Sequence, residues 1–130
     1  MDTRKITLTL GPQLRTVGQA RRAVERLIGG DAPVVFIRDA VLLTSEVVSN
    51  ALHHTAGGCE FAATFDGSAS PWLRVDVRDI SRAVPVAAAK EPGVDGGWGL
   101  RLIEQIAATW GVSPARAGKT VWFELGGQQL

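Results

Sequence analysis

The chain has 130 residues, a hydrophobic content of 45% and a formal net charge of +1. That length is typical of one domain, so we expect residues 1–130 to form a single domain around one core. The small net charge gives no reason to expect direct nucleic-acid binding. No apolar run approaches the roughly 20 residues that span a bilayer, and the single cysteine, Cys59, has no disulfide partner. We therefore expect a cytoplasmic protein without membrane attachment.

Hydrophobic periodicity predicts one strand and two helices in the first part of the chain. Alternating residues predict a half-buried strand over Lys5–Leu10. Apolar residues at helical spacing predict a helix over about Gln13–Ile28, which Gly29-Gly30 would end. A wide apolar stripe predicts a longer helix over about Val34–His54.

The second half of the chain changes to a period of two. Strands are predicted over Glu60–Phe65 and Trp72–Asp79, with a turn between them. No period holds over Ser81–Trp98, which is rich in proline and glycine; a loop of this length in a small domain is often functional. Helical spacing returns over Leu100–Trp110.

A last hairpin is predicted from Val112–Ala115 and Thr120–Leu125. The predicted order is strand, helix, helix, two strands, loop, helix and two strands, which is not a strict βαβ alternation. This order predicts an α+β two-layer sandwich, in which a mixed, mostly antiparallel sheet carries helices on one face.

The first candidate site lies on the longer helix. Glu46 and Asn50 are four residues apart, and His53 or His54 follows, so they form a polar ridge on an otherwise apolar helix. A carboxamide oxygen suits Mg²⁺ that keeps waters and phosphate oxygens. A carboxylate one turn away can orient or deprotonate an attacking group. The same residues also fit an exposed polar helix face.

Two further patches follow in the chain. Asp79, at the end of a core strand, is well placed to accept a hydrogen bond from an amino group such as adenine N6, but it also fits a turn-capping aspartate. The glycines at 96, 97 and 99 run directly into a helix, where free backbone N–H groups favour a phosphate; a hinge fits equally well. The spacing matches neither the Walker A nor the Rossmann pattern.

In this order, the patches resemble the GHKL superfamily of ATPases, and most closely the stand-alone anti-sigma-factor kinase-like ATP-binding proteins of bacteria. The resemblance extends from Leu14 to Leu125. Four motifs carry it: Ser45–His54 is similar to the N-box, Asp79-Ile80-Ser81 with Pro85 to the G1 region, Gly97–Leu100 to the G2 box, and Gly118–Phe123 to the closing strand of this branch.

The resemblance implies a Bergerat fold that binds ATP and Mg²⁺ between the sheet and a lid. It implies that Asn50 coordinates Mg²⁺, that Glu46 is the general base and that Asp79 binds adenine N6. The other implied nucleotide contacts are His53 and His54 near the phosphates, Gly97, Gly99 and Leu100 at the phosphate end of the lid, and Thr120 near the adenine. Arg101 is either a phosphate contact or a solvated side chain of the first helical turn.

One departure from the family pattern lies in the G1 region. Ser81 and Ala83 stand where glycines are usual. Fewer glycines at these positions would alter the hinge of the lid and how tightly the protein closes around the adenine.

Three functions fit this resemblance. The first is an anti-sigma factor with serine/threonine kinase activity, which phosphorylates a STAS-type anti-sigma-factor antagonist or alternatively holds a sigma factor inactive. The second is a nucleotide-dependent protein-binding module without turnover, and the third a detached histidine-kinase-like ATPase domain. The resemblance also implies a possible homodimer through the first strand and helix, in which Ile6, Leu8 and Leu10 are either interface or plain core.

Overall fold

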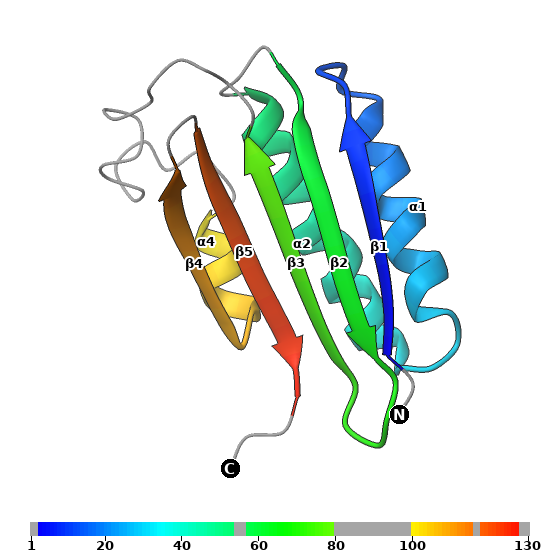
Figure 1. The fold of residues 1–130 in the computed structure, drawn as a ribbon. Coiled ribbons are helices and arrows are strands. Elements are labelled where there is room, and N and C mark those ends of the chain that lie inside the picture. Colours follow the sequence, from blue (N-terminus) through cyan, green and yellow to red (C-terminus); the bar gives the residue numbers. More distant parts are fainter. Residues whose placement is uncertain (1–2, 54–56, 80–99, 116–117, 128–130) are drawn as a thin grey trace.

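The computed structural model describes residues 3–53, 57–79, 100–115 and 118–127, and the structural statements below concern these residues (Figure 1). The elements in chain order are β1 (Thr3–Leu10), α1 (Thr16–Ile28), α2 (Val34–His53), β2 (Cys59–Asp66), β3 (Trp72–Asp79), α4 (Leu100–Ile106), β4 (Thr109–Ala115) and β5 (Gly118–Gly126).

The strands form one open sheet in the order β1-β2-β3-β5-β4. Every described strand pair is antiparallel, so the parallel pairing allowed by the sequence prediction is not seen among these strands. The described helices all lie on one face of the sheet (Figure 1). This arrangement confirms the predicted α+β two-layer sandwich. Among the described helices, none combines the length and the apolar content needed to cross a membrane.

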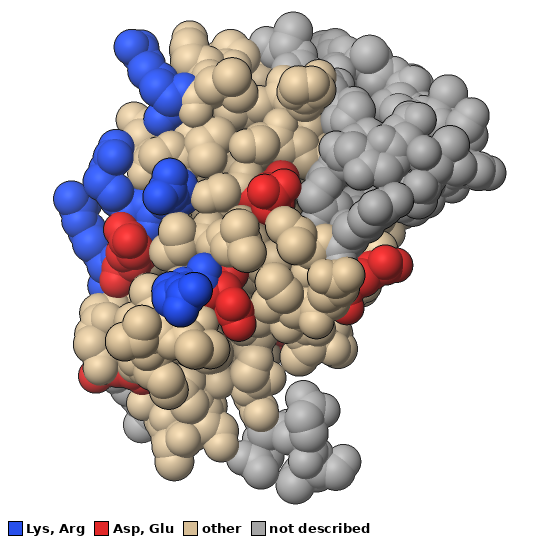
Figure 2. All heavy atoms as spheres, turned by 180° about the vertical axis from the view of Figure 1, so that it is seen from behind, with Lys and Arg blue, Asp and Glu red and all other residues tan. Residues whose placement is uncertain are grey.

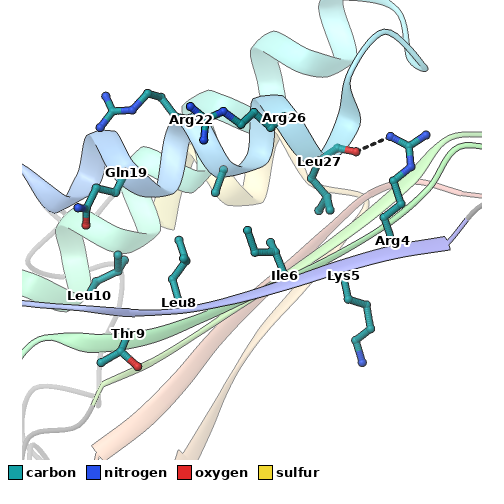
Figure 3. A pocket seen from close by; sticks show the side chains of 11 residues that line it. Arg4, Lys5, Ile6, Leu8, Thr9, Leu10, Gln19, Arg22, Arg26 and Leu27 are labelled. Atoms are coloured by element: carbon teal, nitrogen blue, oxygen red, sulfur yellow. Dashed lines mark hydrogen bonds between the residues drawn. The ribbon is translucent and has the colours of Figure 1, made fainter.

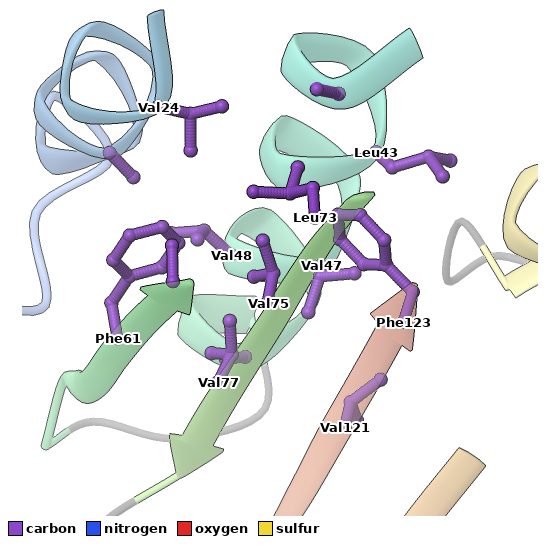
Figure 4. Packing of buried hydrophobic residues seen from close by; sticks show 14 of the residues in the cluster. Val24, Leu43, Val47, Val48, Phe61, Leu73, Val75, Val77, Val121 and Phe123 are labelled. Carbon is purple, nitrogen blue, oxygen red and sulfur yellow. The ribbon is translucent and has the colours of Figure 1, made fainter. Parts of the chain in front are cut away.

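The core fills the space between this face of the sheet and the helices. Alternate residues of β2, β3 and β5 point inward and are buried, because successive side chains of a strand point to opposite faces. They meet the apolar stripes of α1 and α2 (Figure 4). The packed side chains include Val24, Leu43, Val47, Val48, Phe61, Leu73, Val75, Val77, Val121 and Phe123.

The other face of the sheet carries charged side chains. Arg74 of β3 donates hydrogen bonds to Asp76 at 3.0 Å and to Glu124 of β5 at 3.1 Å. Its guanidinium also lies over the Trp122 ring, 4.2 Å from the centroid. Charged side chains on one face and apolar ones on the other are typical of an antiparallel sheet that is half solvated.

Basic residues gather along one edge of the molecule. Figure 2 shows the helix side, where Lys and Arg spheres lie mostly toward the edge that α1 forms. Arg21, Arg22 and Arg26 all belong to that helix. The charge is therefore unevenly distributed, although the net charge is only +1.

The first strand is tied to the end of the first helix. As predicted, α1 ends at Gly29, which adopts a positive φ of 61° and donates its N–H to Glu25 O at 2.9 Å. Arg4 Nη1 donates to Leu27 O at 2.7 Å, and Arg4 also forms an ion pair with Asp31. A cation at the C-terminus of a helix is favourable for its exposed carbonyls and its dipole.

The inward side chains of β1 belong to the core. Leu10 is 2% exposed, while Ile6 and Leu8 are half-buried and pack against the core cluster. Figure 3 shows the three pointing toward α1, beside a pocket of about 660 Å³ between the strand and that helix. Of the two interpretations of these residues, the structure therefore favours the core; a homodimer stays a prediction.

The predicted end of the last helix is wrong. Helix α4 ends at Ile106, and Thr109 and Trp110 already belong to β4. Trp110 lies opposite Phe123 in the sheet, and the Ala108 N–H donates to Glu124 O at 2.8 Å. Threonine and tryptophan suit strands, and pairing with β5 outweighs the helical spacing that Trp110 happens to continue.

The predicted start of the first helix is also wrong, by three residues. The chain turns first, and α1 begins at Thr16 instead of Gln13. The Thr16 hydroxyl donates to Gln13 O at 2.8 Å and to Gly11 O at 3.1 Å, which stabilises the turn. Local side-chain hydrogen bonds of this kind compete with a helical backbone.

Thr44 on α2 provides a test of the core. It is fully buried, and among the described residues its hydroxyl has no hydrogen-bond partner. We expect Thr44→Val to raise the free energy of unfolding by about 1 kcal/mol, because a methyl replaces an unsatisfied buried polar group. Urea unfolding followed by circular dichroism measures this change.

The matched control is Thr16→Val, which removes a hydroxyl that does donate hydrogen bonds and should lower the free energy of unfolding by about 1 kcal/mol. If Thr44→Val destabilises the protein as much as Thr16→Val does, the Thr44 hydroxyl has a partner in the folded protein.

Candidate functional site

Three elements that carry predicted site residues meet at one end of the sandwich. The C-terminal end of α2, the end of β3 and the start of β5 all lie at the same end of the sheet (Figure 1). They carry Asn50, Asp79 and Gly118, respectively. The fold therefore brings parts of the N-box, the G1 region and the closing strand to a common end.

Asp79 is a buried carboxylate at this end. It continues the inward set of β3 after Val75 and Val77, and it is only 2% exposed. Its register neighbour on β2 is Cys59. From β5, the Lys119 ammonium lies 3.5 Å from Asp79 Oδ2, and the Lys119 side chain is 13% exposed. The position thus combines a buried acceptor with a nearly buried cation.

Cys59 lies beside Asp79 in the sheet. Burial raises the pKa of Cys59 to about 11, and the charge of Asp79 adds to this increase. Cys59 therefore stays a protonated thiol at neutral pH, which makes it a poor nucleophile and metal ligand. Cys59 is a buried free cysteine.

Gly118 allows the start of β5 to approach Asp79 closely. Its φ is +124°, a conformation that L side chains rarely adopt. A Cβ at this position would collide with the Asp79 carbonyl oxygen and lie 3.2 Å from Asp79 Oδ1. A glycine is therefore required for the backbone of β5 to pass this carboxylate.

The polar residues along one side of α2 differ in their exposure to solvent. Glu46 is half-buried, Asn50 is 7% exposed and His53, at the end of the helix, is exposed. Because Glu46 and Asn50 are one turn apart on the same helix, the helix fixes their separation. The ridge thus offers a carboxylate and a carboxamide on one rigid element.

The remaining predicted residues are only partly placed. His54, Gly97 and Gly99 lie outside the described residues. Leu100 and Arg101 begin α4, although their side chains are not in the described part of the chain.

Thr120 is not brought to Asp79. It lies opposite Arg78 in the register, on the sheet face away from the helices. There it lines a shallow pocket together with Thr9 and Glu60. The residue of β5 beside Asp79 is Lys119, one position earlier.

The assignment of motifs overlooked Lys119, although the sequence holds the signal that identifies its side. Val121 and Phe123 are inward residues of β5, and a period of two gives Lys119 the same direction. Alternation therefore distinguishes Lys119 from Thr120 where a motif match alone does not.

The described residues fit a nucleotide with Mg²⁺. They contain no group of three or more His, Cys, Asp or Glu side chains able to enclose a metal ion. A cation held through Asn50 would therefore take most of its ligands from phosphate oxygens and water, as Mg²⁺ commonly does. Asp79 supplies the buried acceptor that an exocyclic amino group needs.

Comparison with known proteins identifies the family of this domain. The model of the histidine kinase-like ATPase domain matches residues 10–125. The chain therefore belongs to the family of histidine kinase-like ATPase domains. No curated protein matches it by sequence.

A solved structure shares the fold. The RsbU and RsbW domains of Rv1364c from Mycobacterium tuberculosis match with a TM-score of 0.70 and 20% identity, over 96% of this chain and 33% of that chain. The chain thus spans about a third of the length of that structure. At this identity, the likeness establishes the fold alone.

The contact between Gly118 and Asp79 leads to a stability prediction. Gly118→Ala should lower the free energy of unfolding by about 2 kcal/mol or more, because its backbone conformation disfavours a Cβ and the Cβ would meet the Asp79 carbonyl. Gly30→Ala is the matched control, since a Cβ there meets nothing within 4 Å. It should change the stability by less than about 0.5 kcal/mol. Equal effects of the two changes in urea unfolding would contradict the close approach.

Proposed function

We propose that this chain is an ATP-binding regulatory protein of the cytoplasm: an anti-sigma factor with serine/threonine kinase activity on a STAS-type anti-sigma-factor antagonist. Membership of the histidine kinase-like ATPase domain family supports the ATP-binding part. The kinase part depends on the resemblance of the motifs from Ser45 to Phe123 to the anti-sigma-factor branch.

The observation that carries the proposal is the buried carboxylate of Asp79. Asp79 is 2% exposed at the end of a core strand and lies beside Lys119, so its carboxylate is a buried acceptor held in a fixed position. An adenine amino group is a donor suited to this acceptor. In this family the G1 aspartate has that role, and Asp79 occupies the matching position.

The helix ridge suggests how the phosphates are handled. Asn50 would hold Mg²⁺ through its carboxamide oxygen, and the bound ion would neutralise phosphate charge. Glu46, one turn away, would accept the proton of the attacking serine hydroxyl. Both groups are carried by α2, so their relative positions are set before any ligand arrives.

The metal assignment is tested with Asn50→Ala. Thermal unfolding is measured with ATP and EDTA, and then with ATP and Mg²⁺. In the wild-type protein, Mg²⁺ should add to the stabilisation that ATP gives, because ligands that bind only the folded state stabilise it. In Asn50→Ala, this added stabilisation should be lost.

Ser49→Ala, which changes the neighbouring residue of the same helix, is the control and should retain the Mg²⁺ increment. An unchanged increment in Asn50→Ala would remove Asn50 from the metal site. No stabilisation of the wild-type protein by any nucleotide would contradict ATP binding itself.

The kinase assignment is tested with Glu46→Gln and a purified STAS-domain antagonist. This change keeps the size of the side chain but removes the base. Labelled phosphate transfer should fall about 10²- to 10⁴-fold while ATP binding remains. Glu25→Gln, on the exposed side of α1, should transfer phosphate like the wild type.

The same assay separates the three functions. Transfer that persists unchanged in Glu46→Gln means that Glu46 is not the base. ATP binding without transfer, but with nucleotide-dependent capture of the antagonist or a sigma factor, indicates a binding module without turnover. ATP hydrolysis without transfer to the antagonist indicates a detached ATPase domain.

A further inference from the structure

Lys119 is an unusual neighbour for the adenine-binding carboxylate. Its side chain is only 13% exposed, and lysines withdrawn this far from solvent usually lie beside a charged partner. The partner is Asp79, whose Oδ2 lies 3.5 Å from the Lys119 ammonium. The two residues therefore form one acceptor–donor pair at the end of β3 and β5.

The position of Lys119 is set by the sheet. It shares the inward face of β5 with Val121 and Phe123, and the strand pairing carries it alongside Asp79. Gly118 removes the Cβ that would otherwise separate the two backbones. The pairing of β3 and β5 therefore places the two side chains next to each other.

The distance between Lys119 and Asp79 leaves both groups able to form a further hydrogen bond to a ligand. Charge-assisted hydrogen bonds between nitrogen and oxygen are about 2.7–2.9 Å long, whereas Lys119 and Asp79 are 3.5 Å apart. The ammonium has three donor hydrogens, so it can turn one toward a ligand while it remains beside the carboxylate. A ligand edge that offers a donor next to an acceptor matches such a pair.

We propose that Lys119 and Asp79 together recognise the base: Asp79 accepts from the adenine 6-amino group, and Lys119 donates to the adjacent ring nitrogen N1. The inference rests on the proposed ATP binding. It adds a second specificity-determining residue, on the strand where the family resemblance indicated Thr120. Adenine presents these two groups side by side, and two hydrogen bonds in fixed order discriminate better than one.

A purely structural role for the pair makes a different prediction. If Lys119 only neutralises Asp79, any effect of removing N1 from the ligand is the same with and without the Lys119 side chain. If Lys119 donates to N1, the loss of that acceptor leaves a nearly buried ammonium without its partner in the complex, which is costly.

The test compares ATP with 1-deaza-ATP, in which a C–H replaces ring N1 and the 6-amino group remains. Isothermal titration calorimetry in Mg²⁺ buffer gives both dissociation constants. The wild-type protein should bind ATP about tenfold to a hundredfold more tightly than 1-deaza-ATP, since a hydrogen bond to a charged group is lost. In Lys119→Met, the ratio of the two constants should fall to about one.

Lys5→Met is the matched control, because Lys5 is an exposed lysine of β1 and should keep the wild-type ratio. If Lys119→Met does not fold, the double variant K119M/D79N, which removes both charges, carries the same comparison and should also give a ratio of about one. The ratio compares two ligands on one protein, so a general loss of affinity cancels.

Equal affinity of the wild-type protein for the two nucleotides would overturn this inference while leaving ATP binding intact. A preference for ATP that survives the removal of Lys119 would overturn it as well. Absence of binding of either nucleotide to the wild-type protein would instead contradict the proposed function.

Discussion

The alternation of inward and outward side chains along β2, β3 and β5 is the constraint on which the other features depend. One set of residues packs against α1 and α2 and supplies the core. The other set forms a charged face toward solvent, with Arg74 between Asp76 and Glu124. Any residue that continues the inward set beyond the core enters the end of the sandwich, and Asp79 and Lys119 do so from adjacent strands. The same two-residue period that builds the core therefore also assembles the candidate site.

Stability alone does not account for this charged pair. An ion pair withdrawn from water loses most of its solvation, and apolar side chains of similar size would hold the end of the sheet as well or better. Burial and the charge of Asp79 both raise the pKa of the neighbouring Cys59 thiol. Under the proposed function, this carboxylate is the acceptor for an amino group of the ligand.

Much of the fold follows from the sequence because its elements are strongly periodic. The bounds of β3 agree with the predicted strand, and α2 covers Val34–His53 as its apolar stripe indicates. The errors occur where local spacing is ambiguous. Trp110 continues the helical spacing of α4, but it gains a partner strand only when the whole sheet forms. Such long-range pairing leaves no mark in a short window of sequence.

The sequence also predicts residues of a candidate site, and the structure shows where some of them lie. Motifs identify Asp79, and its burial agrees with the acceptor role assigned to it. Motif comparison also selected Thr120, because a hydroxyl in the closing strand fits the family pattern, although the side chain lies on the other face of the sheet. Side chains of a strand point alternately to its two faces, and in β5 the buried Val121 and Phe123 show which positions face the core. A motif match therefore identifies a contact residue in a strand only when the alternation of inward and outward side chains is considered as well.

The two layers of the sandwich would hold different parts of one ligand. Asp79 and Lys119 belong to the sheet, whereas Glu46 and Asn50 belong to α2. A nucleotide bound at this end would rest its base on β3 and β5 and direct its phosphates toward the helix. Glu46 and Asn50 share one helix, while Asp79 and Lys119 belong to paired strands, so the fold sets the spacing within each layer. Loss of a phosphate would then alter the contacts of α2 and leave those of the base intact.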